Sequence, residues 1–306
     1  MDDQQIRLAV TSPFRLDFTA WALRRRESNI VDQWAGGHYG RLFVTHDRAV
    51  WVTIAQPKGA GQDLVVTLRS DQRTNGQLQQ DLELLIHKML GLTIELGAFY
   101  RLAEDDALLK HLVTAFAGVR PPRFPTMFEA LVNSVACQQV SLDSGIAALN
   151  RLARTFGANL VNDGVRQCAF PRPVDLVDVP EESIKELGFS RQKARTIVDI
   201  SKHVAADGTD LAHLDHMTND QVVGYLTGIR GIGRWSAEYV LLRGLGRLDT
   251  FPGDDVGAQN SLQRLFHRNT KPSYDEIKEL VSRWSPYQGV VYFHLLLEKL
   301  HTKGLV

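Results

Sequence analysis

Features that mark several common protein classes are scarce in this sequence. The 306 residues include two cysteines, Cys137 and Cys168, too few for a disulfide framework or an all-cysteine metal cluster. No run of about 18 apolar residues is present, which argues against a transmembrane helix, and the histidines show no zinc-site spacing. The amino terminus lacks the apolar stretch of a signal peptide. We therefore expect a soluble intracellular protein, cytoplasmic or nuclear.

Net charge is absent as well. Lysine plus arginine and aspartate plus glutamate each total 35, so the overall charge gives no sign of a polyanionic partner. A nucleic-acid-binding protein with this balance needs its positive charge gathered on one face. The composition, 44% hydrophobic and 23% charged, is that of an ordinary globular protein, and the length allows two or three domains.

The first part of the chain predicts a small α+β domain. Alternating apolar residues over 40–56 predict two strands joined by a turn, and 63–70 predicts a third strand after a glycine-rich turn over 57–62. Helical spacing of leucine, isoleucine and methionine follows over 81–92. Strands followed by a helix favour a largely antiparallel sheet, and we place this domain at 1–105.

Helical spacing dominates the remainder, 106–306. Thr126 with Glu129 three residues later predicts a capping box at the start of a helix. Further helices are predicted over 142–157, 181–188, 190–206, 218–228, 235–246, 257–267, 273–284 and 289–301. The predicted fold is an α+β domain followed by an all-α region.

The stretch GIRGIGRWSAEYVLL, 228–242, places three glycines immediately before a predicted helix. A dinucleotide fingerprint does not match, because Ser236 stands where a third glycine is needed and a helix precedes the motif. A helix–hairpin–helix does match. Gly231 and Gly233 would let a phosphate approach the backbone, and the free N–H groups of the next helix would bind it without reading base sequence. On the glycines alone, a tight turn between two packed helices is an equal alternative.

LTGIRGIGRWSAEYVLL and DTFPGDDVGAQ together resemble the helix–hairpin–helix glycosylase superfamily of base-excision repair. With CQQVS and RWSPYQGVVYFHLL, they are most similar to the 3-methyladenine DNA glycosylase II branch, which also has an N-terminal α+β domain of this size. The resemblance implies two helical subdomains with the active-site cleft between them. It also implies damaged double-stranded DNA as partner and no required cofactor, and one extruded base per chain favours a monomer.

Asp255 is the predicted catalytic residue. Breaking an N-glycosidic bond builds positive charge on the deoxyribose, which a fixed carboxylate stabilises. Asp255 ends the FPGDD loop at the start of a predicted helix, whose dipole favours a negative charge, and the resemblance places it on the family's catalytic aspartate. We expect its neighbour Asp254 to cap the helix or face solvent, although either aspartate could be an N-cap alone. Some relatives carry an attacking lysine where this chain has Trp235, which implies a monofunctional enzyme that uses water and leaves an abasic site.

An aromatic pocket for the extruded base is predicted around Trp235 and Tyr239, which lie four residues apart and share a helix face. The resemblance adds Tyr287. Electron-rich rings favour the positively charged alkylated purines. The alternative for each ring is a place in the core. The resemblance also assigns Gln139 of CQQVS to filling the gap left in the DNA stack, and a solvated polar group is the alternative.

Other predicted DNA contacts lie at the hairpin. Gly231, Gly233, Arg234, Ser236 and Arg230 are expected to face the backbone phosphates. A second group of basic residues, in SRQKAR, consists of Arg191, Lys193 and Arg195. By resemblance, a monovalent cation, Na⁺ or K⁺, is implied at the backbone carbonyls of Thr227, Ile229 and Ile232.

Two other functions stay open at this point. One is a glycosylase for a different lesion such as oxidised guanine, against which Trp235 in place of lysine argues. The other is a non-catalytic module that only holds DNA, against which the FPGDD motif and the aromatic residues argue. The preferred lesion stays open among alkylated, deaminated and etheno bases.

Overall fold

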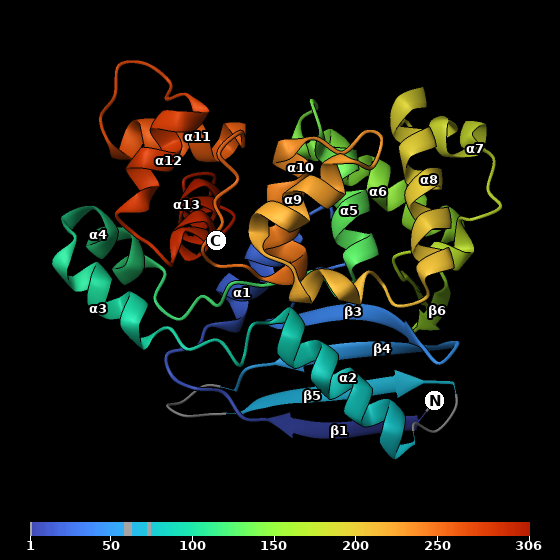
Figure 1. Cartoon of the computed structure of the whole chain (residues 1–306). Coiled ribbons are helices and arrows are strands. Elements are labelled where there is room, and N and C mark those ends of the chain that lie inside the picture. Colours follow the sequence, from blue (N-terminus) through green and yellow to red (C-terminus); the bar gives the residue numbers. More distant parts are fainter. Residues whose placement is uncertain (1, 58–62, 72–74) are drawn as a thin grey trace.

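The computed structural model describes residues 2–57, 63–71 and 75–306. Figure 1 shows an N-terminal sheet at one end, α2 across it, and most other helices gathered beyond β3. The sheet order is β1-β5-β4-β3-β2, with every neighbouring pair antiparallel. The strands are β1 (Asp2–Leu8), β2 (Gln33–Ala35), β3 (His38–Thr45), β4 (Arg48–Ala55) and β5 (Leu64–Ser70). The predicted antiparallel sheet is confirmed.

The β3–β4 hairpin follows directly from its sequence. Its register pairs Phe43 with Val50 and Tyr39 with Ile54, so apolar side chains line one face. The two turn residues have positive φ, 49° at His46 and 56° at Asp47. Such a two-residue turn matches the right-handed twist of the strands. Most of the predicted turn over 57–62 lies outside the described residues.

Every helix expected from spacing is present, and the part of the chain before residue 116 adds three that were not predicted, α1, α3 and α4. The helices are α1 (Leu16–Arg24), α2 (Gly76–Met89), α3 (Gly97–Asp105), α4 (Ala107–Ala115), α5 (Met127–Cys137), α6 (Leu142–Phe156), α7 (Glu181–Glu186), α8 (Arg191–Asp207), α9 (Asn219–Thr227), α10 (Arg234–Val240), α11 (Val256–Leu265), α12 (Tyr274–Ser282) and α13 (Gln288–His301). A π-helical turn, Leu241–Leu245, extends α10. The later region is helical as predicted, apart from one short hairpin between α6 and α7 that is formed by β6 (Asn159–Asn162) and β7 (Val165–Cys168).

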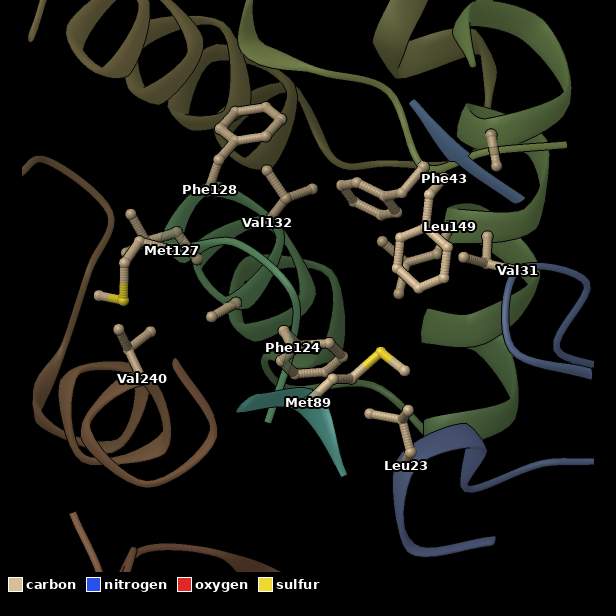
Figure 2. Packing of buried hydrophobic residues seen from close by; sticks show 14 of the residues in the cluster. Leu23, Val31, Phe43, Met89, Phe124, Met127, Phe128, Val132, Leu149 and Val240 are labelled. Carbon is tan, nitrogen blue, oxygen red and sulfur yellow. The ribbon is translucent and has the colours of Figure 1, made fainter. Parts of the chain in front are cut away.

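The expected boundary after residue 105 does not separate two cores. It falls between α3 and α4, which pack against each other. One hydrophobic cluster joins the sheet to α5, α6, α8 and α10, and a second joins α1, α3 and α4 to α11, α12 and α13. Figure 2 shows Met89 of α2 beside Phe124, and Phe43 of β3 in the same cluster as Leu149 of α6. The N-terminal segment is therefore part of the framework that positions the helices.

A buried ionic group joins the sheet to α5. Thr126 caps this helix by accepting from the Glu129 amide, as predicted. Glu129 does not complete a capping box, because its carboxylate pairs instead with Arg41 of β3. Arg41 also pairs with Asp32 at 2.7 Å, and these charged side chains are buried. Each of these three charges is thus paired, which is the condition for tolerating a charge in a core.

Candidate active site

A cavity of about 1040 Å³ lies where the α5–α6 loop, the α9–α10 hairpin, the loop before α11, and α13 meet. Predicted site residues that line it are Gln139, Gly231, Gly233, Trp235, Ser236, Tyr239 and Asp255. These residues come from segments more than one hundred positions apart in the chain. The fold therefore brings the motifs CQQVS, GIGRWSAEY and FPGDD to one place.

Asp255 is held at the wall of this cavity by three hydrogen bonds. It is the N-cap of α11, and its Oδ1 accepts from the Ala258 amide at 2.8 Å. Its Oδ2 accepts from Trp235 Nε1 at 3.4 Å and from the Tyr292 hydroxyl at 3.3 Å. The capping role expected for Asp254 thus belongs to Asp255. Asp255 can both cap α11 and take part in chemistry, because its Oδ1 accepts from the helix amide while its Oδ2 lies among the aromatic residues of the cavity.

Asp254 belongs to a separate network that anchors the loop. Its Oδ2 pairs with Arg234 Nη2 at 2.9 Å, and the Arg234 guanidinium lies 3.5 Å from the centre of the Tyr274 ring. Tyr274 and the Gly253 amide both donate to the buried carboxylate of Glu238, the latter at 3.2 Å. Burial raises the pKa of Glu238, and these hydrogen bonds oppose the shift. Arg234 therefore forms an ion pair that joins the FPGDD loop to α10, and its contact with DNA stays a prediction.

The glycine hairpin has different requirements at its two predicted positions. Gly231 has φ of +89°, and a Cβ there would lie 2.2 Å from Thr196 Oγ1 of α8. Glycine is required at this position by both conformation and packing. Gly233 has extended backbone, forms the N-cap of α10 without a side-chain cap, and faces open space. Among the described residues, no side chain accepts a hydrogen bond from the amides at the start of α10. Arg230 is exposed on the same turn.

The expected cation site rests on three carbonyls of this hairpin. The Ile229 carbonyl already accepts from the Ile232 amide at 3.0 Å. A carbonyl oxygen has a second lone pair, so the geometry stays compatible with a cation, and the site at Thr227, Ile229 and Ile232 stays a prediction. The described residues contain no group of three or more histidine, cysteine, aspartate or glutamate side chains placed to hold a metal ion.

Two of the three predicted pocket aromatics line the cavity. The rings of Trp235 and Tyr239 lie 5.3 Å apart between centres, at an angle of 30°. Tyr287 is outside the lining, and its ring packs on Phe99 of α3 at 5.7 Å. Tyr287, the N-cap of α13, thus lies outside this cavity, contrary to the prediction. Tyr292, inside this helix and also in the RWSPYQGVVYFHLL stretch, lines the cavity instead.

Arg25 reaches the same cavity from the end of α1 and was not predicted. Its Nη1 donates to the Tyr239 hydroxyl at 2.9 Å, and its Nη2 donates to Asn133 Oδ1 at 2.6 Å. Burial works against its charged form, yet the neighbouring Tyr239, Cys137 and Asp32 keep the pKa of Arg25 above its ordinary value. Only the tertiary contact between α1 and α10 reveals this role.

The loop after α5 is tied to the hairpin. Gln138 Nε2 donates to the Gly231 carbonyl and to Ser236 Oγ, both at 2.9 Å. Lys193 Nζ in turn donates to the Gln138 carbonyl at 2.7 Å. Ser236 and Lys193 were expected to contact DNA, but Ser236 is buried and both side chains hold this loop. Gln139 remains exposed at the cavity, with φ of 49°.

A glycine hairpin between two helices, a capping aspartate one loop later and an aromatic cavity between them define a helix–hairpin–helix protein of the DNA-repair type. A family model described as "HhH-GPD superfamily base excision DNA repair protein" matches residues 132–286. The chain belongs to this superfamily. The predicted family and fold class are thereby confirmed, and the predicted enzyme class with them.

Relatives and solved structures agree with this membership. The chain is 30% identical over 235 residues to "DNA-3-methyladenine glycosylase" of Bacillus subtilis, covering 76% of this chain and 78% of that protein. It is 28% identical over 190 residues to "DNA-3-methyladenine glycosylase 2" of Escherichia coli, covering 62% and 64%. The solved structure of a "3-methyladenine dna-glycosylase from Archaeoglobus fulgidus" superposes with a TM-score of 0.83 at 25% identity, covering 96% and 97%. In the described part of the chain, no helix combines the length and hydropathy needed to cross a membrane.

Proposed function

We propose that this protein is a DNA-3-methyladenine-type glycosylase that acts on duplex DNA as a single chain. It extrudes an alkylated purine into the cavity, hydrolyses its N-glycosidic bond and leaves an abasic site. The observation that carries the proposal is the Asp255 carboxylate, fixed by Ala258, Trp235 and Tyr292 at the wall of an aromatic cavity. The names of the relatives support the choice of alkylated bases.

The chemistry follows from the position of this carboxylate. As the bond between C1′ and the base nitrogen breaks, its electron pair leaves with the base and positive charge develops on the sugar. A preorganised negative charge beside the sugar stabilises that transition state, most strongly where water is excluded. Water then adds to C1′ and releases a proton. Trp235 occupies the position where some relatives have an attacking lysine. The nucleophile is therefore water, and the enzyme is monofunctional.

The base itself would occupy the space beside Trp235, Tyr239 and Tyr292. Flipping is needed because the bond is out of reach inside a stacked duplex. Gln139 is exposed at the rim and takes the place of the extruded base in the stack. The hairpin amides at Gly231 and Gly233, with Arg230, hold the strand through a phosphate.

Incubation with a methylated duplex, followed by chromatography of the released bases, tests the proposal. Free 3-methyladenine and 7-methylguanine, in numbers equal to the abasic sites formed, are expected. Tight DNA binding without release of any base would instead indicate a non-catalytic module. Release from an 8-oxoguanine duplex alone would indicate a different lesion class. Affinity for duplex DNA should fall steeply with salt, as phosphate contacts require.

A further inference from the structure

Two arginines share the buried end of the cavity without a carboxylate partner. Arg25 is 4% exposed, Arg243 is 0% exposed, and both line the cavity. Neither forms an ion pair in the part of the chain that the structure describes. Arg25 Nε, and both Nε and Nη1 of Arg243, have no hydrogen-bond partner there either. Buried charges are normally paired, so these two guanidiniums call for an explanation.

Both guanidiniums are held in place by groups that carry no net charge. Arg243 lies on the π-helical turn after α10, and its Nη2 donates to the carbonyls of Ala22, at 2.8 Å, and Leu23, at 3.3 Å. The centre of the Phe124 ring lies 5.5 Å from the guanidinium carbon of Arg25 and 5.0 Å from that of Arg243. None of these contacts neutralises the positive charge, and buried charges are screened far less than exposed ones.

The Tyr239 hydroxyl connects these cations with the aromatic part of the cavity. It accepts from Arg25 Nη1 at 2.9 Å, and the Arg243 guanidinium lies 5.6 Å from the centre of the Tyr239 ring. A hydroxyl also has one proton to donate, and no described residue accepts it. Burial raises the pKa of Tyr239, while Arg243 and Arg25 oppose the shift. The phenol therefore keeps its proton at neutral pH and is available as a donor.

The cavity wall thus carries opposite charges at its two ends. Asp255 accepts from Trp235 Nε1, and the Trp235 ring lies beside that of Tyr239. Tyr239 in turn accepts from Arg25. A nucleotide whose sugar lies at Asp255 and whose base lies along these rings has its outer edge at the Tyr239 hydroxyl. When the bond between C1′ and the base nitrogen breaks, the negative end faces the sugar that becomes positive, and the positive end faces the base that gains the electron pair.

We propose that Tyr239 is a second catalytic residue, whose hydroxyl donates a hydrogen bond to the departing base, and that Arg25 and Arg243 are positioning residues that polarise this donor. The inference rests on the proposed function for its reaction, base release at Asp255. The base gains one unit of negative charge as the bond breaks, and no proton has to move. The donor and the two cations therefore stabilise the transition state more than the bound substrate, which is the requirement for catalysis.

The size of this contribution depends on the charge of the base. Hypoxanthine is neutral in DNA and becomes an anion as it leaves, so the donor and the cations attract it in the transition state. 7-Methylguanine is a cation in DNA and becomes neutral as it leaves, so its departure relieves repulsion from the arginines. The ratio kcat/KM compares the transition state with the free substrate. Loss of the Tyr239 hydroxyl should therefore lower kcat/KM more for the neutral base.

The test measures kcat/KM of the full chain on one duplex with hypoxanthine and one with 7-methylguanine. Tyr239→Phe keeps the ring and removes the donor. The ratio of kcat/KM for hypoxanthine to that for 7-methylguanine should fall at least about tenfold, because loss of one preorganised donor typically costs about 10²–10³ in rate where negative charge develops. Arg25→Met should lower the same ratio. Tyr225→Phe is the matched control, because it removes a hydroxyl on α9 outside the cavity, and it should leave the ratio unchanged.

A purely structural role for Tyr239 would lower excision of both lesions by the same factor. That result would overturn this inference, and so would wild-type release of 7-methylguanine without any release of hypoxanthine. Both results leave the proposed function standing. Release of hypoxanthine that depends on the Tyr239 hydroxyl, without release of any alkylated base, would overturn the proposed function alone. If Tyr239→Phe fails to fold, Arg25→Met decides the outcome, since an unchanged ratio in that variant contradicts the inference.

Discussion

Replacing Asp255 by asparagine isolates the charge from the shape of the site. Asparagine is as good an N-cap as aspartate, so Oδ1 can still accept from the Ala258 amide. The new amide N–H₂ replaces Oδ2 and faces the Trp235 N–H, one donor against another. Loss of one hydrogen bond to a charged group costs about 1.5–3 kcal/mol of stability. The protein should therefore remain folded at ordinary temperatures.

Catalysis should respond far more strongly than stability. Removal of one preorganised transition-state contact typically costs about 2.7–4 kcal/mol, or about 10²–10³ in rate. Loss of a full charge beside the sugar should cost at least that much. We therefore expect Asp255→Asn to slow base excision by at least about a hundredfold, with DNA affinity within severalfold of wild type.

The assay is single-turnover release of 7-methylguanine from a labelled duplex, with affinity measured by fluorescence anisotropy. Asp254→Asn is the matched control, because Asp254 pairs with Arg234 outside the hydrogen bonds of Asp255. It should retain excision within severalfold of wild type. Wild-type excision by Asp255→Asn, or an equal loss in both variants, would refute the assignment of the charge at 255.

Three other predictions concern the framework and the pocket. Gly231→Val should lower the free energy of unfolding by about 1–3 kcal/mol, because Gly231 has φ of +89° and the new Cβ would meet Thr196. Urea denaturation measures the change, and Gly233→Ala is the control because a Cβ at Gly233 would meet no atom within 4 Å. Arg25→Met should slow excision about tenfold or more, because Tyr239 and Asn133 lose their hydrogen-bond donor and each unsatisfied buried group costs about 1–3 kcal/mol. An unchanged excision rate would contradict a role for Arg25 in the pocket. Burial lowers the pKa of His294 to about 4, so its contribution to stability is complete above the ordinary pKa of about 6.5 and is lost as the pH falls towards 4. At pH 5 the loss is about 2 kcal/mol, and His294→Leu should remove that part of the pH dependence of unfolding; an unaltered slope would show that His294 is not buried in its neutral form.

Local sequence patterns predicted most of the fold because they depend on short-range physics. Helices such as α8 and α12 follow from spacing and from N-caps at Ser190 and Ser273. The β6–β7 hairpin was not predicted because its two strands have four residues each, too few to show a clear alternation of apolar and polar residues. A domain boundary is harder to place from the sequence for a different reason. Hydrophobic periodicity identifies the buried face of an element, but it does not identify the partner of that face.

In the candidate site, too, local motifs predict some residues, and only tertiary contacts place the others. Asp255 and Trp235 were identified because they lie in compact motifs that the resemblance covers. Tyr287 and Tyr292 are five residues apart, and only the start of α13 decides which ring enters the cavity. The pocket contact of Arg25 and the loop-holding role of Ser236 depend on contacts between distant segments, which no local pattern contains. The ion pair of Arg234 could not be predicted either, because its partner, Asp254, is twenty residues away.

The most direct test of the central claim is a crystal structure with duplex DNA that carries a positively charged abasic-site mimic. The account predicts that the cationic ring nitrogen lies within hydrogen-bonding distance, about 3 Å, of Asp255 Oδ2, beside Trp235 and Tyr292. A complex in which the cationic ring contacts a different carboxylate, or lies outside this cavity, would contradict it.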